Sequence, residues 1–338
     1  MTPFFMLRGM FGIKHIRTHL RLMRDFRSFL RIHFLSAALE SGILQALDHP
    51  RSPDDLASRL GIQRRQLLET FLDLGVAVGD LRKVGPHYQL KSRDSRVLAR
   101  GDGDALAALV QEYAAYHADV FQSLTAVLKG GPLGEYLEHY GTLIARSSRT
   151  LEPLIGNFVK QAVASHRPHH LLEVGCGSGI YLKYAHAAFP DLEGIAIDLN
   201  QEVVERARQN LEQWGIADRF QVLCADIRQL PAQAKRTYDW ISLYQNVYYF
   251  EPEERPRLYQ LLGSLLEPNG VLAIISLMHG HTLSTLNFDL VLQSTSGCAP
   301  LPVLEQVIHD LRASGFDRVE HIRLMPGEPL YAVLGYKK

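Results

Sequence analysis

The chain has 338 residues, of which 46% are hydrophobic, and its 36 Lys and Arg residues balance its 36 Asp and Glu residues. This composition is typical of a folded globular protein with room for one large domain or two ordinary ones, and it argues against a disordered chain. The balanced charge gives no reason to expect nucleic acid or another polyanion as a partner of the whole chain.

Cysteine use and the N-terminal segment bear on the compartment. Cys176, Cys224 and Cys298 lie far apart and are odd in number, which argues against a disulfide framework or a Cys-x-x-Cys metal site. Basic residues interrupt the apolar N-terminal segment, and no stretch reaches the roughly 18 consecutive apolar residues of a membrane span. We therefore expect a cytoplasmic protein.

The first predicted element is one long, basic, amphipathic helix over residues 11–34. Its apolar residues recur at helical spacing beside a stripe of arginines, and residues 1–34 carry Lys14 and six arginines against Asp25 alone. A helix of this kind can lie on an anionic membrane surface. It can also pack on a neighbouring subunit with its arginines solvated, and this second interpretation is the stronger one.

Residues 35–90 show the order helix, helix, helix, hairpin. A helix at 35–47 precedes a short one that Ser52 can cap and Pro53 can begin; a helix at about 63–74 and a hairpin at 81–90 follow. This is the order of a winged helix, which reads DNA in many regulators. The segment is not strongly basic, however, and its last helix is mostly apolar, so we expect it to mediate dimerisation.

Residues 104–163 are predicted to be helical throughout, with interruptions at 130–132 and near Gly141. After them, from Leu171, the pattern changes to short apolar runs that alternate with polar helical segments. That alternation is the signature of a parallel sheet with crossover helices.

A glycine-rich turn follows the first predicted strand of this half, residues 170–174. Gly175, Gly177 and Gly179 lack the Cβ that would collide in a sharp turn, so the backbone can approach a ligand closely. A dinucleotide site would show the spacing GxGxxG and would need a small residue where this chain has Ile180. The spacing therefore disfavours a pyrophosphate ligand.

Two further predicted strands end in carboxylates. The strand at 194–198 ends in Asp198, which is placed to accept hydrogen bonds from two ribose hydroxyls. The strand at 220–227 ends at Asp226, whose side chain can hydrogen-bond an adenine amino group. The remaining elements are strands at 238–244 and 271–277, a helix at about 253–266 that ends in Pro268-Asn269-Gly270, and a closing antiparallel hairpin at 316–325 and 330–335.

Taken in order, these motifs resemble the class I S-adenosylmethionine-dependent methyltransferases over residues 170–338. With the N-terminal module added, the chain is similar to the small-molecule O-methyltransferases of bacterial and plant secondary metabolism. The resemblance implies a Rossmann-like, seven-stranded, mostly parallel α/β sheet with helices on both faces, preceded by a mainly α-helical winged-helix domain. The domain boundaries we expect are 1–100 for the amphipathic helix and winged helix, 101–165 for a helical connector that contributes to the substrate pocket, and 166–338 for the cofactor domain.

The resemblance also implies a cofactor site. Its expected members are Glu173, Gly175, Gly177, Gly179, Asp198, Leu199, Asp226, Ile227 and Tyr244. The glycine turn would back the methionine part of S-adenosylmethionine, Asp198 would hold the ribose, and Asp226 with Ile227 would frame the adenine. This cofactor carries an ammonium and a sulfonium but no phosphate, so an acid such as Glu173 is attractive there. The alternative is that Glu173 is a solvated acid at a strand end.

The catalytic pattern of the family is broken in this sequence. The O-methyltransferases that the chain resembles place a histidine base just after the fourth strand of the sheet domain, and Tyr249 occupies that position here. Neutral tyrosine, with an ordinary pKa of about 10, is a poor base at neutral pH, although it can orient a substrate or donate to an enolate. Tyr248 and Tyr249 could equally be packing residues.

His279 and His281, on a loop after the fifth strand, are the remaining base candidates, and structural or solvated histidines are the alternative. No third ligand stands at convincing spacing, so no metal is expected. Asn246, Tyr248 and Asn287 are the expected substrate residues.

The sequence thus predicts an S-adenosylmethionine-dependent methyltransferase that acts on an oxygen or an activated carbon of a small molecule, with no nucleic-acid partner. A homodimer is expected, and peripheral membrane contact through residues 1–34 stays open. The alternatives are a methyltransferase for a lipophilic, membrane-held acceptor and a non-catalytic winged-helix regulator that senses the cofactor.

Overall fold

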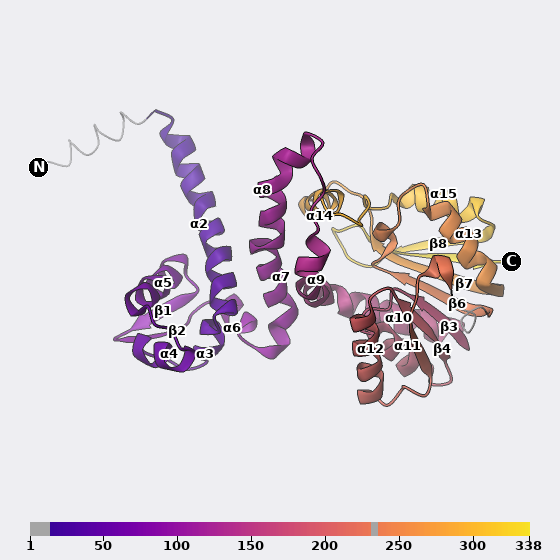
Figure 1. The fold of residues 1–338 in the computed structure, drawn as a ribbon, viewed down its shortest axis with the longest axis horizontal. Helices are drawn as coiled ribbons and strands as arrows, with labels where there is room; N and C mark the ends of the chain where they lie inside the picture. Colours follow the sequence, from indigo (N-terminus) through magenta and orange to yellow (C-terminus); the bar gives the residue numbers. More distant parts are fainter. Residues whose placement is uncertain (1–13, 231–235) are drawn as a thin grey trace, which may run out of the picture. The chain divides into compact units, whose positions relative to one another are not determined.

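The structure is a computed structural model that describes residues 14–230 and 236–338 (Figure 1). Its contacts divide the chain into two compact units. The first comprises the described residues up to Gln122 together with Tyr140–Thr150, and the second comprises Ser123–His139 and Leu151–Lys338. The first three residues of the predicted N-terminal helix lie outside the described residues.

The first unit is helical apart from one hairpin. Its first elements are α2 (Ile16–Glu40), α3 (Ile43–Ala46), α4 (Pro53–Leu60), α5 (Arg65–Val78), β1 (Leu81–Val84), β2 (His87–Leu90) and α6 (Arg93–Leu98). The predicted division of the first helix near residue 34 is wrong. Phe34, Leu35, Ala38 and Leu39 form one continuous buried face, so α2 runs on to Glu40 and ends where Gly42 adopts a positive φ of 74°.

Local signals set the ends of the next two helices. Ser52 caps α4 by accepting a hydrogen bond from the Asp55 amide at 3.2 Å, and Pro53 takes the first helical position, as predicted. Helix α5 is longer than expected and ends at Val78, directly before Gly79. The predicted hairpin forms, with β1 and β2 antiparallel.

The helices that follow are α7 (Asp104–Ala114), α8 (Tyr116–Leu128) and α9 (Tyr136–Ser147). The predicted break near Gly141 is wrong, because Gly141 lies inside α9. A glycine inside a helix costs only about 1 kcal/mol relative to alanine, which a surrounding run of good helix formers can offset. The predicted interruption at 130–132 is confirmed, because it lies between the end of α8 at Leu128 and the start of α9 at Tyr136, and a further break falls at Ala115.

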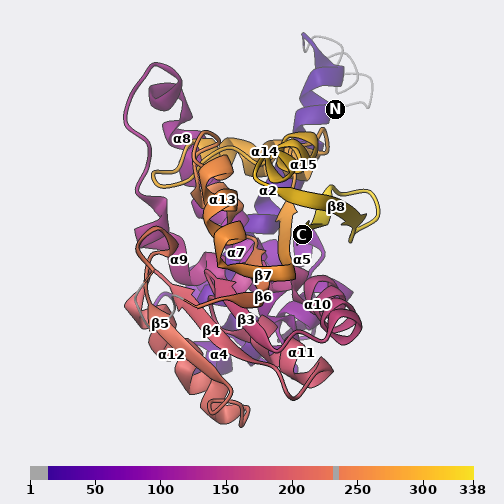
Figure 2. The ribbon, with the colours of Figure 1, turned by 90° about the vertical axis from the view of Figure 1, so that its right-hand side faces the viewer.

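The second unit is built on a seven-stranded sheet in the order β5-β4-β3-β6-β7-β9-β8 (Figure 2). Its strands are β3 (His170–Val174), β4 (Glu193–Asp198), β5 (Phe220–Cys224), β6 (Tyr238–Tyr244), β7 (Leu266–Leu277), β8 (Phe316–Arg323) and β9 (Leu330–Lys337). The pairs from β5 to β7 are parallel, and β9 is antiparallel to both of its neighbours. The mostly parallel sheet and its closing antiparallel hairpin are therefore confirmed.

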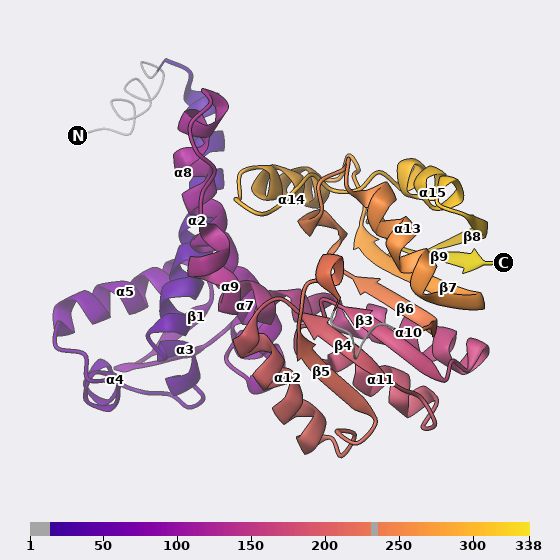
Figure 3. The same cartoon turned by 45° about the vertical axis from the view of Figure 1, so that its right-hand side comes forward.

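Helices cover both faces of this sheet (Figure 3). On one face lie α10 (Glu152–His166), α11 (Ile180–Ala188) and α12 (Gln201–Gln213), and on the other lie α13 (Arg255–Leu265) and α15 (Leu304–Ala313). Successive residues of a strand point to opposite faces, so Leu171 packs in the first core and Leu172 in the second. Within residues 14–230 and 236–338, no helix is long and apolar enough to cross a membrane.

Two strand boundaries differ from the sequence prediction. Strand β5 ends at Cys224, two residues before Asp226, because the chain turns there into the short 3₁₀ helix Ile227–Gln229. Strand β7 begins at Leu266 rather than Val271, and it takes up the extra residues in an irregularity opposite Tyr238 and Trp240. Pro268-Asn269-Gly270 therefore lies within the bounds of β7 and not at the end of a helix.

One ion pair fixes α2 to the hairpin side of the first unit. The Asp80 carboxylate is fully buried and accepts hydrogen bonds from Arg31 Nε at 2.8 Å, Arg31 Nη2 at 2.9 Å and Ser92 Oγ at 2.6 Å. These bonds to Asp80, with a further one to Asp94, raise the pKa of Arg31 above its ordinary value. A buried carboxylate that loses its cation is strongly destabilising.

We therefore expect Arg31→Met to lower the free energy of unfolding by about 2 to 3 kcal/mol, a figure reduced because the arginine is partly exposed. Urea denaturation followed by circular dichroism measures the change. Arg24→Met, on an exposed position of the same helix, is the control. Equal midpoints for the two variants would show that the pair does not stabilise the fold.

Candidate cofactor and active site

The carboxyl ends of β3, β4, β5 and β6 bring the predicted site residues to one edge of the sheet. Strand β3 has β4 on one side and β6 on the other, so chain order reverses there. In open α/β sheets a reversal of this kind leaves a crevice at the carboxyl ends of the strands, where ligands bind. The glycine turn leaves β3 at this crevice.

The glycine turn is held against the end of β4 by backbone hydrogen bonds. The amides of Gly175 and Cys176 both donate to the Ile197 carbonyl, at 2.8 and 3.0 Å. The Gly177 amide donates to Asp198 Oδ2 at 3.0 Å. Gly175 has a φ of 67°, and a Cβ added there would collide with the amide nitrogen of Asn246, so both conformation and contact require glycine.

Glu173 is buried beneath this turn. It is only 2% exposed and shares a sheet face with Leu171, the face that α11 covers. The interpretation of Glu173 as a solvated acid is therefore wrong. Burial, with a smaller contribution from the charge of Asp198, raises the pKa of Glu173 from its ordinary value of 4.5 to about 8.

Tyr181 and Tyr244 lie in the core between the helices and the face of the sheet that carries Glu173. The rings of Tyr181 and Tyr244 meet edge to face with centroids 5.3 Å apart, and the Tyr244 hydroxyl accepts a hydrogen bond from Trp240 Nε1 at 3.3 Å. Burial, and secondarily the charge of Glu173, raise the pKa of Tyr181, while burial above all raises that of Tyr244. Tyr244, a predicted cofactor residue, thus lies 6% exposed in the layer below the turn.

Asn246 stands directly against the glycine turn. Its Nδ2 donates to the Val174 carbonyl, and the side chain is 7% exposed. Its Oδ1 is buried and has no hydrogen-bond partner among the described residues. A buried acceptor without a donor is costly, so this atom is suited to a donor supplied by a ligand. The residue expected to contact substrate therefore lies on the side of the glycine turn.

Strand β4 ends in a cap that leaves an apolar side chain exposed. Asp198 Oδ1 accepts a hydrogen bond from the Asn200 amide at 3.1 Å, and Asn200 caps α12. Leu199 between them is 65% exposed. Asp198 and Leu199 thus form a polar and an apolar edge of the crevice.

Asp226 is engaged by a neighbouring cation. It accepts hydrogen bonds from the Arg228 amide at 2.9 Å and from Arg228 Nε at 2.9 and 3.0 Å. Partial burial raises the pKa of Asp226, but the hydrogen bonds and charge of Arg228 outweigh it, and the net pKa is lowered. Ile227, the next residue, is 3% exposed. Sequence reasoning did not include Arg228, although its position two residues after Asp226 was visible.

The two predicted tyrosines differ in burial. Tyr248 is 8% exposed and packs with Leu292, Cys298 and Leu301, whereas Tyr249 is 43% exposed. The Tyr248 ring contacts Tyr249 and Phe288 edge to face, at centroid distances of 5.0 and 5.5 Å. Tyr248 is therefore part of an apolar cluster beside the end of β6.

The two histidines also differ. His279 Nδ1 lies 3.2 Å from Asp289 Oδ2 on α14 (Leu283–Gln293), while the ring of His281 lies beside that of His279, with centroids 6.1 Å apart. Asn287 is half-buried on α14. No group of three or more His, Cys, Asp or Glu residues suited to a metal ion occurs in the described part of the chain. Residue spacing alone could not have paired His279 with Asp289.

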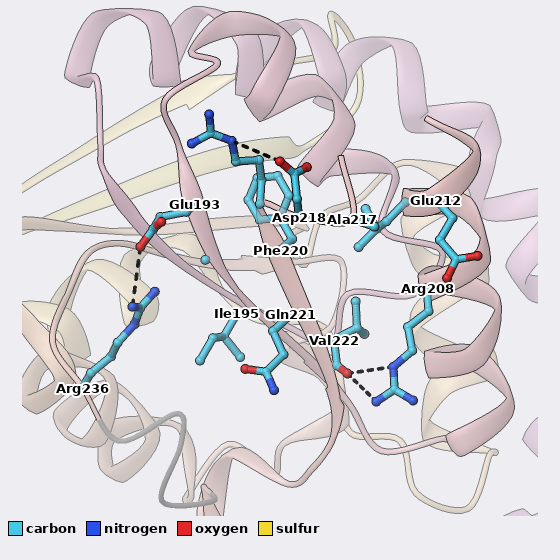
Figure 4. A pocket seen from close by; sticks show the side chains of 13 residues that line it. Glu193, Ile195, Arg208, Glu212, Ala217, Asp218, Phe220, Gln221, Val222 and Arg236 are labelled. Atoms are coloured by element: carbon cyan, nitrogen blue, oxygen red, sulfur yellow. Dashed lines mark hydrogen bonds and ion pairs between the residues drawn. The ribbon is translucent and has the colours of Figure 1, made fainter. Parts of the chain in front are cut away.

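A separate cleft of about 570 Å³ opens at the other edge of the sheet (Figure 4). It is lined by the first residues of β4 and β5, away from the glycine turn. Three of its charged residues are engaged within the unit: Arg208 donates to the Val222 carbonyl at 3.0 and 2.6 Å, and Glu193 lies 3.8 Å from Arg236. This cleft contains no predicted site residue.

Part of the second unit matches a known protein family. Residues 171–270 match the family model described as "Methyltransferase domain". A malonyl-[acyl-carrier protein] O-methyltransferase from Anoxybacillus flavithermus is 38% identical over 76 residues, which are 22% of this chain and 27% of that protein. A trans-aconitate 2-methyltransferase from Yersinia pseudotuberculosis is 31% identical over 108 residues, 32% of this chain and 38% of that protein. The chain thus spans well under two thirds of these relatives.

Solved structures match over nearly the whole chain at low sequence identity. The mitomycin 7-O-methyltransferase MmcR has a TM-score of 0.78 at 20% identity, covering 95% of this chain and 98% of that one. Human N-acetylserotonin methyltransferase, solved with S-adenosylmethionine, has a TM-score of 0.75 at 17% identity, covering 96% and 99%. An O-methyltransferase family protein from Burkholderia thailandensis has a TM-score of 0.78 at 18% identity, covering 97% and 99%. These likenesses establish the fold.

The raised pKa of Glu173 predicts a pH-dependent stability. Between pH 4.5 and 8 this residue ionises in the unfolded chain but stays protonated in the folded chain, so the folded state loses stability as pH rises through that window. Glu173→Gln removes the penalty. The variant should gain about 1.4 kcal/mol per pH unit over the native chain across most of this range and stay level above pH 8.

Melting temperatures from pH 5 to pH 9 measure this gain. Glu205→Gln, an exposed acid on α12, is the control and should show no such pH-dependent gain. A Glu173→Gln curve parallel to that of the native chain would mean that the acid ionises normally in the folded state.

Proposed function

Because residues 171–270 belong to the methyltransferase-domain family, we propose that the chain transfers a methyl group from S-adenosylmethionine to an oxygen or an activated carbon of a small molecule. The observation that carries the proposal is the buried Glu173 beneath a glycine turn whose Gly177 amide is bound to Asp198. A site built around an uncompensated acid suits a cationic ligand and disfavours a phosphate.

The residues at the crevice fit the parts of this cofactor one by one. Glu173 and the unpartnered Asn246 Oδ1 would face its ammonium and sulfonium end, behind the glycine turn. Asp198 would accept hydrogen bonds from the ribose hydroxyls, since each carboxylate oxygen has capacity beyond its one backbone donor. Exposed Leu199 and the backbone around Ile227 would contact the adenine, with Asp226, already held by Arg228, at its amino group.

When bound, the cofactor supplies a methyl group activated by sulfonium, so the protein mainly has to hold an acceptor in line with it. The apolar cluster of Tyr248, Leu292, Cys298 and Leu301, with Phe288 against it, would form one wall for that acceptor. Tyr249 and Asn287 would lie at its polar margin. The wall is mostly apolar, which favours a small, largely apolar acceptor. The acceptors in the names of MmcR and the human neighbour, mitomycin and N-acetylserotonin, are small molecules as well.

Calorimetry with S-adenosylmethionine and S-adenosylhomocysteine tests the cofactor assignment. Asp198→Ala should weaken both ligands by about 100-fold, because it removes two ribose acceptors and frees the Gly177 amide. Asp218→Ala, an exposed acid elsewhere in the second unit, is the control and should bind as the native chain does. A native chain that binds neither ligand would end the proposal.

The N-terminal unit supports a homodimer. Leu22, Phe26 and Phe29 lie on one face of α2 and are 59%, 48% and 54% exposed. Apolar side chains of this size are costly to leave in water, and a second copy of the same helix would cover them. Arg17 and Arg21 lie on another face of α2, where the same dimer leaves them solvated. Helix α5 occupies the position of the DNA-reading helix of a winged helix. Its Arg65 is paired with Asp54 and Glu69, which supports a protein contact over a nucleic-acid contact.

The dimer prediction separates the two faces of α2. The double variant Phe26→Glu/Phe29→Glu should halve the mass measured by light scattering, because charge replaces the apolar contact. Arg17→Glu/Arg21→Glu introduces as many glutamates away from the Leu22, Phe26 and Phe29 face and should leave the mass unchanged. A monomeric native chain that sediments with anionic vesicles, and stops doing so in the arginine variant, would instead support the lipophilic, membrane-held acceptor.

A further inference from the structure

His279 and Asp289 form a pair that is fixed from three sides. His279 leaves the end of β7, and its Nδ1 lies 3.2 Å from Asp289 Oδ2. Asp289 is 8% exposed, and its other oxygen accepts a hydrogen bond from the Leu301 amide at 2.8 Å. The His279 amide donates to the Pro302 carbonyl at 2.8 Å. The His279 imidazole and the Asp289 carboxylate are therefore held next to each other by three segments: the loop after β7, helix α14 and residues 301–302.

This arrangement selects a tautomer. A carboxylate can only accept, so the imidazole nitrogen that faces Asp289 carries the proton and Nε2 carries the lone pair. The His279 side chain is 41% exposed while that of Asp289 is 11% exposed, so Nε2 can be reached by a ligand and the orienting acid cannot. A histidine oriented in this way by a buried acid is the pairing that general-base catalysis uses.

The pair stands on the ligand-binding edge of the sheet. Strand β7 neighbours β6, and its Leu277 amide donates to Gln245 Oε1, one residue before Asn246, at 3.1 Å. Phe288, next to Asp289 in α14, touches the Tyr248 ring, and Leu277 packs on the same cluster. An apolar surface thus adjoins the base.

We propose that His279 is the catalytic base of this enzyme, with Asp289 as its positioning residue, and that the acceptor is a hydroxyl group on an aromatic or enolic ring. The inference rests on the proposed methyl transfer. His279 Nε2 takes the hydroxyl proton as the oxygen forms its bond to the methyl carbon, and the carbon–sulfur bond breaks with its electron pair left on sulfur. The resulting imidazolium is stabilised by the Asp289 carboxylate. Such a hydroxyl is acidic enough for histidine to assist, and its ring suits the apolar wall.

The groups that face His279 come from several elements. Asp289 lies on α14, and His281 lies on the same loop as His279. Glu328, from the hairpin between β8 and β9, accepts hydrogen bonds from Thr282 Oγ1 at 2.7 Å and Ser284 Oγ at 2.6 Å, so it is bound to the other end of the loop. Asp289 is the carboxylate whose removal acts on His279 directly.

Asp289→Asn gives a test with a defined direction. The Leu301 amide needs an acceptor, so the carboxamide oxygen should turn to Leu301 and its NH₂ group should face His279 Nδ1. That reverses the tautomer and puts the proton on Nε2, where it blocks the base. Asp310→Asn on α15 is the matched control, since Asp310 is 7% exposed and accepts a hydrogen bond from Gln306 of the same helix.

Nitrogen-15 spectra of the imidazole rings, assigned with His279→Asn, report the tautomer without any acceptor. We expect the Nδ1–H form in the native chain and in Asp310→Asn, and the Nε2–H form in Asp289→Asn. A native chain with the Nε2–H form, or a tautomer unchanged in Asp289→Asn, would overturn the role of Asp289. Calorimetry on the same samples should show unchanged cofactor affinity, and a failure to bind cofactor would instead overturn methyl transfer itself.

Transfer of labelled methyl groups to catechol, 4-nitrophenol and 4-hydroxybenzoate tests the base and the acceptor class. Turnover should fall by about 10² to 10⁴ in His279→Asn and Asp289→Asn with little change in KM. His309→Asn, an exposed histidine on α15, should match the native rate. A fully active His279→Asn variant would overturn the base, and a chain that binds cofactor but methylates no phenol would overturn the acceptor class.

Discussion

A carboxyl group buried at the end of β3 constrains the rest of the second unit. Glu173 lies under the glycine turn on the face of the sheet that α11 covers, and its burial raises its pKa to about 8. An apolar residue at this position would pack at lower cost, and buried acids with strongly shifted pKa values are concentrated at functional sites. A cationic ligand above the turn would favour the ionised form of Glu173 and so offset the cost of burying its charge.

The surrounding architecture makes that position accessible. Parallel strands place the ends of β3, β4 and β5 side by side, and the glycine turn lets the backbone pass close to a ligand without a Cβ in the way. Asn246, two residues after the end of β6, adds a hydrogen-bond acceptor beside the glycine turn. The cleft at the amino ends of β4 and β5 differs, because Arg208, Glu193 and Arg236 there are engaged with protein groups.

The acceptor side is organised by contacts between elements distant in the sequence. Asp289 on α14 holds His279 on the loop after β7, and the segment near Leu301 holds both. The family position for a base is occupied by Tyr249, which is exposed and lies next to the packed Tyr248. A base on the loop after β7 would stand at the same edge of the sheet as one after β6, because the two strands are parallel neighbours.

Local and periodic features were readable from the sequence alone. The alternation of apolar runs with helices predicted the mostly parallel sheet, Ser52 and Pro53 predicted the start of α4, and the spacing of the three glycines with Asp198 predicted the cofactor edge. These features depend on neighbours within a few residues or on strand order, which the sequence states directly. The burial of Glu173, the unpartnered Asn246 Oδ1 and the His279–Asp289 pair were decided by the tertiary structure. Each depends on which side chains meet across elements, and on how much water is removed between them, and spacing along the chain specifies neither.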